Sequence, residues 1–271
     1  EAEAAHPHDV PLADAVMTAE GQAKPLEILG AELLPGSAAR LAWSPTELFE
    51  GVPVSTPVLA VNGAKPGPIL CLTAAVHGDE LNGIEIVRRV LHDIDPDKLS
   101  GAVIGVPIVN VQGFRRGSRY LPDRRDLNRS FPGSESGSMA GRLARVFMHD
   151  VVARADIGID LHTAAVHRDN LPQIRADIND PLLAPLARAF SAPVQLHSAP
   201  PQGSLRAAAA ELGVSVMVYE AGEALRFDEI AIQIGLRGVV NTLRQLAMLP
   251  PVVVVVAMQK LFIRGLVESE K

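Results

Sequence analysis

The chain has 271 residues, of which 48% are hydrophobic and 21% are charged. This composition is typical of a globular protein with a sizeable core, built as one large α/β domain or as one domain with a small appendage. The formal net charge is −6 and the sequence has no block rich in Lys and Arg, which argues against nucleic acid as a partner. Cys71 is the only cysteine, so no intrachain disulfide can form and a bound metal has to rely on His, Asp or Glu.

The first 61 residues divide into an arm and a set of short strands. Residues 1–25 are polar and rich in alanine without a steady period, which predicts a loose N-terminal arm. The start, "EAEAAHPHDV", has neither a basic stretch nor an apolar run, so it is not an intact signal peptide. Between Leu26 and Val61, short apolar pieces are broken by "PG", "SP", "VP" and "TP", a pattern that predicts edge strands.

From residue 68 onward, apolar strands alternate with amphipathic helices. "PILCLTAAV" predicts a buried strand over 68–76, and "ELNGIEIVRRVLHDI" predicts a helix over 80–94 with its apolar residues on one stripe. A strand over 102–109 and a long polar loop over 110–136 follow. The later predictions are a helix over 138–152, a strand over 155–162, helices over 181–190 and 203–213, a strand over 214–220, a helix over 227–249 and a strand over 250–258.

The predicted strands are almost continuous apolar runs separated by helices, which is typical of a mainly parallel sheet covered on both faces. We therefore expect a doubly wound α/β fold over residues 26–250, with a mainly parallel, mixed sheet and helices on both faces. The run "PPVVVVVAM" (250–258) is far too short to span a bilayer, so we expect no membrane association.

Three of the predicted strands end in residues that can bind a metal or move a proton: His77, His162 and Glu220. Ligands of an open α/β sheet bind outside the carboxyl ends of its strands. Glu80 follows His77 by three residues, a spacing that brings both side chains to one side of the turn. Two imidazoles and one carboxylate, with a position left for water, form a catalytic zinc set, and cobalt or manganese could substitute. The alternative is a group of hydrogen-bonded loop residues, because an isolated H-x-x-E often occurs by chance.

The predicted loop 110–136 concentrates arginine and aspartate in "NVQGFRRGSRYLPDRRDLNRSFPG". A loop of this length without structure of its own is usually functional or disordered. Guanidinium groups suit bidentate binding of carboxylates, so the loop indicates a small acidic ligand. A solvated surface is the simpler interpretation for four of its arginines: Arg115, Arg116, Arg124 and Arg125.

Together these motifs resemble the succinylglutamate desuccinylase/aspartoacylase family, a branch of the zinc carboxypeptidase-like superfamily. The matching stretches are "HGDE" (77–80), "RY" (119–120) with "DLNRSFPG" (126–133), "DLHTA" (160–164) and "YEAGE" (219–223). They occur in the family's order and in the same relation to the strands, and the resemblance covers about residues 57–250. It implies a zinc carboxypeptidase-like fold, with residues 26–250 as the zinc-dependent catalytic domain.

The resemblance also implies the reacting groups. His77, Glu80 and His162 match the three ligands of one zinc ion per chain. Glu220 matches a general base that later acts as the general acid, and Arg119 resembles the arginine that polarises the scissile carbonyl.

A second set of matches concerns the substrate. Asn128 and Arg129 resemble a pair that binds a substrate carboxylate, and Arg206 is a looser match to a further carboxylate contact. Asp160 either orients a metal-ligand histidine or has a structural role at the strand end. The segment 162–178 departs from the family pattern, and four of its residues could line a pocket or, for His167, form a surface turn: His167, Arg168, Asn170 and Arg175.

The function implied is hydrolysis of the amide bond of a small N-acylated amino acid or amine that carries a carboxylate. One rival is a zinc carboxypeptidase-type peptidase that trims C-terminal or side-chain-linked residues, and another is a metal-binding protein without activity. Family members often carry a further β-rich segment, so residues 251–271 are expected to begin a C-terminal β segment that is truncated or absent. A homo-oligomer stays open, and we expect a cytoplasmic protein without excluding the periplasm or secretion.

Overall fold

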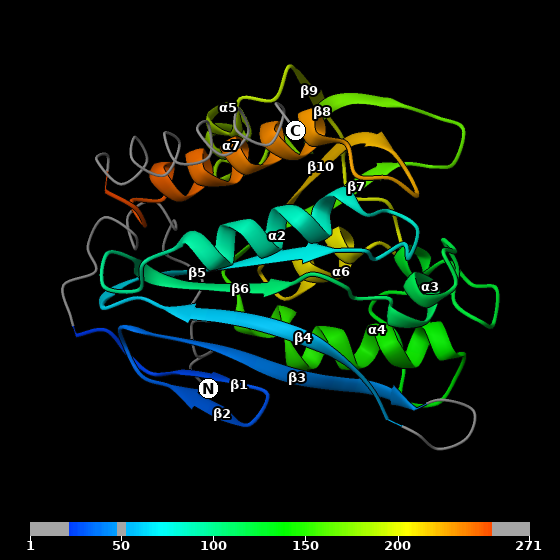
Figure 1. Ribbon diagram of the computed structural model, residues 1–271, viewed down its shortest axis with the longest axis horizontal. Helices are drawn as coiled ribbons and strands as arrows, with labels where there is room; N and C mark the ends of the chain where they lie inside the picture. Colours follow the sequence, from blue (N-terminus) through cyan, green and yellow to red (C-terminus); the bar gives the residue numbers. More distant parts are fainter. Residues whose placement is uncertain (1–21, 48–52, 251–271) are drawn as a thin grey trace, which may run out of the picture.

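The computed structural model describes residues 22–47 and 53–250, which form an eight-stranded sheet with helices on both faces (Figure 1). Residues 1–21 of the predicted arm and the predicted C-terminal segment 251–271 lie outside the described residues, as does nearly all of the strand predicted over 250–258. In the described part of the chain, no helix is long and apolar enough to cross a membrane.

The sheet is mixed, and its middle is parallel. Its strand order is β3-β4-β6-β5-β7-β10-β8-β9. The central strands β6, β5, β7 and β10 are parallel to one another, whereas β3 and β4 at one side and β8 at the other join by antiparallel pairing. The bounds are β3 Ser37–Glu47, β4 Pro53–Asn62, β5 Lys65–Ala74, β6 Ser100–Val106, β7 Ile157–Ala164, β8 Asn170–Ala176, β9 Val194–His197 and β10 Ser215–Glu223. A separate hairpin pairs β1 (Leu26–Ile28) with β2 (Ala31–Leu33).

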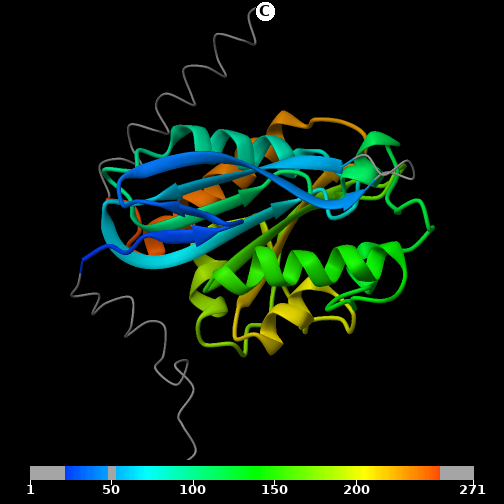
Figure 2. The same ribbon diagram turned by 90° about the horizontal axis from the view of Figure 1, so that it is seen from below.

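Helices cover the two faces of the sheet in separate layers (Figure 2). One apolar core joins the sheet to α2 (Asn82–Asp93), α5 (Leu183–Phe190) and α7 (Glu229–Gln245). The other core joins the opposite face to α4 (Met139–Asp150) and α6 (Leu205–Glu211). This arrangement confirms the predicted doubly wound fold, because all eight residues of β7 are buried between the two layers.

Capping side chains fix where several helices begin. Ser138 accepts a hydrogen bond from the Gly141 amide at the start of α4, and Ser204 does the same for the Ala207 amide at the start of α6. Such caps typically contribute about 1 kcal/mol each. The predicted helices therefore occur close to their predicted positions.

The irregular segments differ from the sequence prediction. The loop predicted over 110–136 contains the short helix α3 (Val111–Arg115) and the single turn η1 (Leu127–Arg129), and a further turn, η2, spans Val152–Arg154. Strands β8 and β9 are not predicted at all. Pro172 and Arg175 break the apolar pattern of β8, and β9 has only four residues, three of them exposed, so neither strand has a clear hydrophobic signal.

The chain leaves β5 by a tight path that brings the predicted metal ligands together. Ala75 adopts the left-handed conformation, with φ 47°, directly after the strand. Gly78 then packs against α3 so closely that a Cβ at position 78 would collide with the backbone of Gly113 and Phe114. The segment between β5 and α2 is therefore held by the close contact of its backbone with α3.

We expect Gly78→Ala to lower the free energy of unfolding by about 1–3 kcal/mol, because a side chain in this contact has to displace the segment that carries the predicted ligands. Urea unfolding of the purified protein measures the change. Gly141→Ala in α4 is the matched control, because a Cβ there meets nothing closer than 3.4 Å. Equal stability of Gly78→Ala and the parent protein would contradict the close approach of Gly78 to α3.

Candidate metal centre

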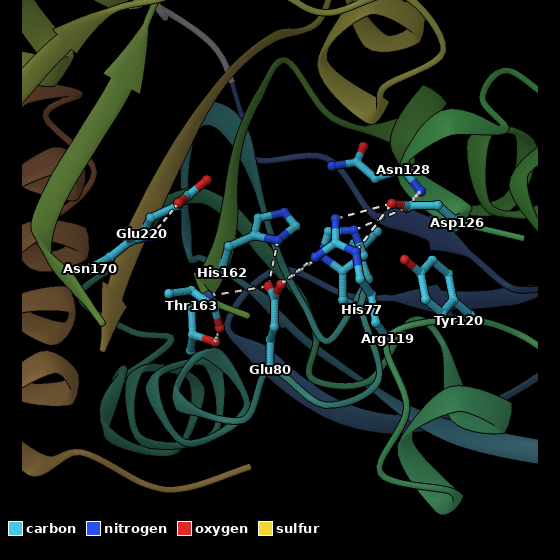
Figure 3. A network of polar contacts seen from close by, with 12 residues as sticks. His77, Glu80, Arg119, Tyr120, Asp126, Asn128, His162, Thr163, Asn170 and Glu220 are labelled. Atoms are coloured by element: carbon cyan, nitrogen blue, oxygen red, sulfur yellow. Dashed lines mark hydrogen bonds and ion pairs between the residues drawn. The ribbon is translucent and has the colours of Figure 1, made fainter. Parts of the chain in front are cut away.

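Three buried side chains converge at the carboxyl ends of the central strands (Figure 3). His162 lies in β7, His77 follows β5, and Glu80 precedes α2. Each offers one ligand atom, and these atoms all lie within 4.8 Å of one another. The three residues are no more than 5% exposed. The group can hold a metal ion, as the sequence predicts.

The Glu80 carboxylate lies between the two imidazoles. Nδ1 of His77 is 2.8 Å from Oε1 of Glu80, and Nδ1 of His162 is 2.7 Å from Oε2. Burial alone would raise the pKa of the Glu80 carboxyl, but His162 and His77 outweigh this effect and lower the pKa to about 2. Glu80 is therefore anionic and faces two imidazole nitrogens.

A carboxylate supports each imidazole from behind. Nε2 of His162 lies 2.6 Å from Asp160, whose other oxygen accepts a hydrogen bond from the Thr73 hydroxyl at 2.6 Å. Nε2 of His77 lies 3.1 Å from Asp126. A carboxylate at Nε2 favours the tautomer with its proton on that nitrogen, in which Nδ1 could bind a metal. Both imidazoles therefore present the nitrogen that a metal ligand needs.

The charge distribution also fits a cation. Burial lowers the pKa of His162, yet Asp160 and Glu80 raise it well above its ordinary value. The pKa of His77 is raised in the same way by Glu80 and Asp126, against the effect of burial. Both imidazoles thus lie in a strongly negative environment, which a bound cation would satisfy as well as a proton does.

Arg119 links the ligand Glu80 to the supporting Asp126. Its Nη1 donates to Oε1 of Glu80 at 3.2 Å, and its Nε and Nη2 donate to one oxygen of Asp126 at 3.3 and 3.0 Å. Burial raises the pKa of the Asp126 carboxyl, but His77 and Arg119 hold it well below its usual range. Sequence reasoning assigns no role to Asp126, and only its position at the head of "DLNR" hints at one.

Glu220 lies on β10, next to β7. Its Cα is the register partner of His162, so its side chain starts beside the predicted ligands. Oε2 of Glu220 accepts a hydrogen bond from Nδ2 of Asn170 at 2.6 Å and forms an ion pair with Nη2 of Arg175 at 3.2 Å. The Glu220 side chain is 18% exposed. It is therefore held from one side and open on the other.

The three residues that the sequence predicts for carboxylate binding come from the other side of the centre. Oδ1 of Asn128 accepts a hydrogen bond from the Leu205 amide at 2.9 Å, at the start of α6. Arg129 donates to the backbone carbonyl of Asn128, and Arg206 donates to the carbonyl and hydroxyl of Ser198. Within residues 22–47 and 53–250, neither arginine lies within ion-pair distance of a carboxylate.

Arg206 is only 6% exposed, and burial lowers the pKa of its guanidinium. A buried cation is expensive unless an anion or several hydrogen bonds compensate it. The acceptors of Arg206 are the carbonyl and hydroxyl of Ser198 and the carbonyl of Ala199, all of them neutral. This part of the molecule is therefore suited to receive an anion from outside the chain.

One cavity of about 590 Å³ lies between the predicted metal ligands, Glu220 and the predicted carboxylate-binding residues. Its charged and imidazole lining comprises His77, Glu80, Arg119, Arg129, His162, Arg168, Arg175, Arg206 and Glu220. Asn128 and Asn170 also line it. All eight site residues that the sequence predicts thus line a single cavity. Of the four further candidates from segment 162–178, Arg168, Asn170 and Arg175 line it as well. His167 does not line it and is exposed, with φ 63°.

A family model described as the succinylglutamate desuccinylase/aspartoacylase catalytic domain matches residues 66–246, well over half of the chain. The chain belongs to this family. The match confirms the resemblance that the motifs indicate, and it includes every residue assigned to the site.

Curated members of the family match about half of the chain. An N-alpha-acetyl-L-2,4-diaminobutyric acid deacetylase from Halomonas elongata is 34% identical over 128 residues, which are 47% of this chain and 37% of that protein. A succinylglutamate desuccinylase from Pseudomonas aeruginosa is 33% identical over 142 residues, 48% of this chain and 40% of that protein. The matched regions therefore span about two fifths of the length of these relatives.

Solved structures of the family share the fold. The product-bound ectoine utilization protein EutE from Ruegeria pomeroyi superposes with a TM-score of 0.73 and 25% identity, over 84% of this chain and 71% of that chain. A succinylglutamate desuccinylase/aspartoacylase from Rhodobacter sphaeroides gives a TM-score of 0.70 and 28% identity, over 79% and 66% of the two chains. The zinc carboxypeptidase-like α/β fold implied by the motifs is therefore confirmed.

We expect Asp126→Asn to weaken metal binding by about 10- to 100-fold, because the supporting carboxylate behind His77 is replaced by a neutral amide. Titration of the metal-free protein with Zn²⁺, followed by calorimetry, measures the affinity. Asp97→Asn is the control, since Asp97 is exposed and distant from the cavity. Unchanged affinity in Asp126→Asn would remove Asp126 from the metal centre.

Proposed function

We propose that this protein is a zinc-dependent hydrolase that cleaves the amide bond of a small N-acylated amino acid or amine carrying at least one carboxylate. The observation that carries the proposal is the convergence in one cavity of a buried His77–Glu80–His162 group, the carboxylate of Glu220 and several arginines that have no carboxylate partner among the described residues. The family relationship supports it, because the curated relatives are named as a deacetylase and a desuccinylase of small amino acids.

Zinc is the metal that these residues fit best. Two imidazoles and one carboxylate leave a fourth position for water, and the cavity contains no thiolate. One zinc ion per chain would activate a water molecule, lowering the pKa of the water from 15.7 to about 7. Asp126 and Asp160 lie at the Nε2 atoms of the two imidazoles, where they would favour the tautomer that such binding requires.

Glu220 is the proposed general base. Its carboxylate faces the cavity beside His162, so it can accept a proton from the attacking water. The same carboxyl then protonates the nitrogen of the leaving amine, which is too poor a leaving group as an anion. No other carboxylate among the described cavity-lining residues is free for this step, because Glu80 is held by both imidazoles.

Arg119 is proposed to stabilise the oxyanion that forms on the acyl carbonyl. Asp126 holds its guanidinium through two nitrogens, and Nη1 lies beside the ligand Glu80. A substrate carbonyl oxygen near the metal would therefore meet the Arg119 guanidinium, which Asp126 already holds in place. Loss of one such donor typically costs about 3–4 kcal/mol in the transition state.

Asn128, Arg129 and Arg206 are proposed to bind the substrate carboxylate. Because the Asn128 oxygen accepts a hydrogen bond from the Leu205 amide, its NH₂ group is left to donate to a ligand. Arg129 and Arg206 line the same cavity without an acidic partner among the described residues. A carboxylate bound here would hold the acyl carbonyl over the metal.

The size of the cavity favours a small substrate over a peptide. A volume of about 590 Å³ is within the range of about 300–1,000 Å³ that is usual for small-molecule sites. Five arginines line it against two carboxylates, so a substrate with a second carboxylate suits it better than one with a second ammonium group.

The test combines metal analysis with a substrate panel. Elemental analysis should find one zinc per chain, and amine release should occur from an N-acetyl or N-succinyl amino acid, with aspartate and glutamate derivatives preferred over 2,4-diaminobutyrate. If the protein holds zinc, releases no amine from any member of the panel and cleaves C-terminal residues from peptides, it is the peptidase and not the deacylase.

We expect Glu220→Gln to keep its zinc and to lose turnover by about 100- to 10,000-fold, because the amide cannot accept the proton from water. Elemental analysis and steady-state kinetics on the best panel substrate measure the two quantities. Glu211→Gln, an exposed change on α6, is the control. Near-normal turnover of Glu220→Gln would place the general base elsewhere.

We expect Arg129→Ala to raise KM by about 10- to 100-fold, since a hydrogen bond to a charged group contributes about 1.5–3 kcal/mol. Arg129 is exposed and has no carboxylate partner among the described residues, so stability and zinc content should not change. Arg125→Ala removes an exposed arginine of the same loop that does not line the cavity, and it serves as the control. An unchanged KM would mean that the carboxylate is held elsewhere.

A further inference from the structure

The Glu220 carboxylate is held by only one of its two oxygens. Nδ2 of Asn170 donates to Oε2 at 2.6 Å, and Nη2 of Arg175 lies 3.2 Å from the same atom. No donor in residues 22–47 or 53–250 contacts Oε1. The contacts therefore fix the carboxylate without covering its second oxygen.

An irregularity in the sheet places Asn170 beside Glu220. In the antiparallel pairing of β10 and β8, Glu220 is opposite Gln173 and Gly222 is opposite Asn170. On β10 one residue lies between Glu220 and Gly222, whereas on β8 two residues, Leu171 and Pro172, lie between Asn170 and Gln173. Strand β8 therefore has one extra residue at this point. In a regular strand, positions 170 and 173 would face opposite sides of the sheet. The bulge brings Asn170 to the side of Glu220, as bulges often do beside active sites.

Arg175 reaches Glu220 by regular pairing from the other direction. It is the register partner of Val218, two residues before Glu220, and therefore lies on the same face of the sheet. Nε of Arg175 is buried and has no hydrogen-bond partner among the described residues. A buried unpaired donor costs free energy, so its position is not explained by stability alone.

We infer that Asn170 and Arg175 are positioning residues, which hold Oε2 of Glu220 so that Oε1 faces the reacting water. The inference rests on the proposed function, because it takes Glu220 as the general base. The proton of the attacking water passes to Oε1, and Oε1 returns it to the nitrogen of the leaving amine as the C–N bond breaks. Asn170 and Arg175 touch neither the substrate nor the metal in these steps.

This arrangement explains why two donors converge on one oxygen. A glutamate side chain that can rotate freely presents its oxygens to the cavity in many directions, and most of them lead away from the metal centre. Anchoring one oxygen to β8 removes this freedom before the substrate binds. Catalysis then depends on the bulge in β8, which carries no reacting group of its own.

The kinetic test uses the zinc-loaded full chain and the best substrate of the panel. Asn170→Ala and Arg175→Gln should each lower kcat by about 10- to 100-fold, as expected for a misplaced reacting group, while KM changes much less and zinc content stays the same. Asn170→Asp has nearly the shape of asparagine but replaces the donor with a carboxylate. It should lower kcat at least as much as Asn170→Ala, whereas a role in packing alone predicts a mild effect.

Arg168→Gln is the matched comparison for Arg175→Gln. Arg168 lines the same cavity and has the same charge, but no contact joins it to Glu220 among the described residues. Its loss should act on KM rather than on kcat. Equal losses of kcat in Arg168→Gln and Arg175→Gln would overturn the inference, because cavity charge and not the contact with Glu220 would then explain both.

A second measurement does not depend on activity. The destabilisation by Asn170→Ala, measured by urea unfolding, should largely disappear when Glu220 is already replaced in Glu220→Ala, because the two residues are coupled. Additive losses would show that the contact is absent and would overturn the inference.

The two proposals fail in different ways. A fully active Glu220→Gln contradicts the proposed general base. An inactive Glu220→Gln with fully active Asn170→Ala and Arg175→Gln contradicts the positioning role alone.

Discussion

The site depends on one buried carboxylate that contacts four polar groups. Glu80 is 2% exposed, and its two oxygens contact His77, Arg119, His162 and the Thr163 amide. A carboxylate this deep would be very costly without partners, so the elements that supply them are tied to its position. Two of the partners come from β7, one from the segment after β5 and one from the loop after α3. The fold around the cavity is therefore organised by the need to compensate a single charge.

The parallel strands explain how residues far apart in sequence meet at that charge. His77 follows β5, and His162 and Glu220 lie near the carboxyl ends of the neighbouring strands β7 and β10; parallel strands place all their carboxyl ends at one edge. Apolar runs that end in a polar side chain are visible in the sequence, so this part of the site and the doubly wound fold can both be predicted. Local spacing alone gives only the pair His77 and Glu80, whereas the place of His162 depends on the order of the strands.

Asp160, the carboxylate behind His162, is among the sequence predictions, but the roles of Asp126 and Asn170 could not be predicted, each for a different physical reason. Asp126, the residue that caps η1, reaches His77, and nothing in a polar loop indicates which of its aspartates will do so. Asn170 reaches Glu220 through a bulge, and a shift of one residue in register reverses the face of every side chain in a strand. Period and composition describe regular elements, but both contacts arise where the structure is irregular.

The charge of the cavity is independent of the charge of the protein. The chain has a formal net charge of −6, yet five arginines line the cavity and three of them, Arg129, Arg168 and Arg206, have no carboxylate partner among the described residues. The acids of the site face the metal position, while these arginines surround the space beside it. A field of this form would attract an anionic ligand into the cavity even though the surface as a whole repels it. In the proposed reaction, substrate binding and proton transfer would therefore use opposite charges within one cavity.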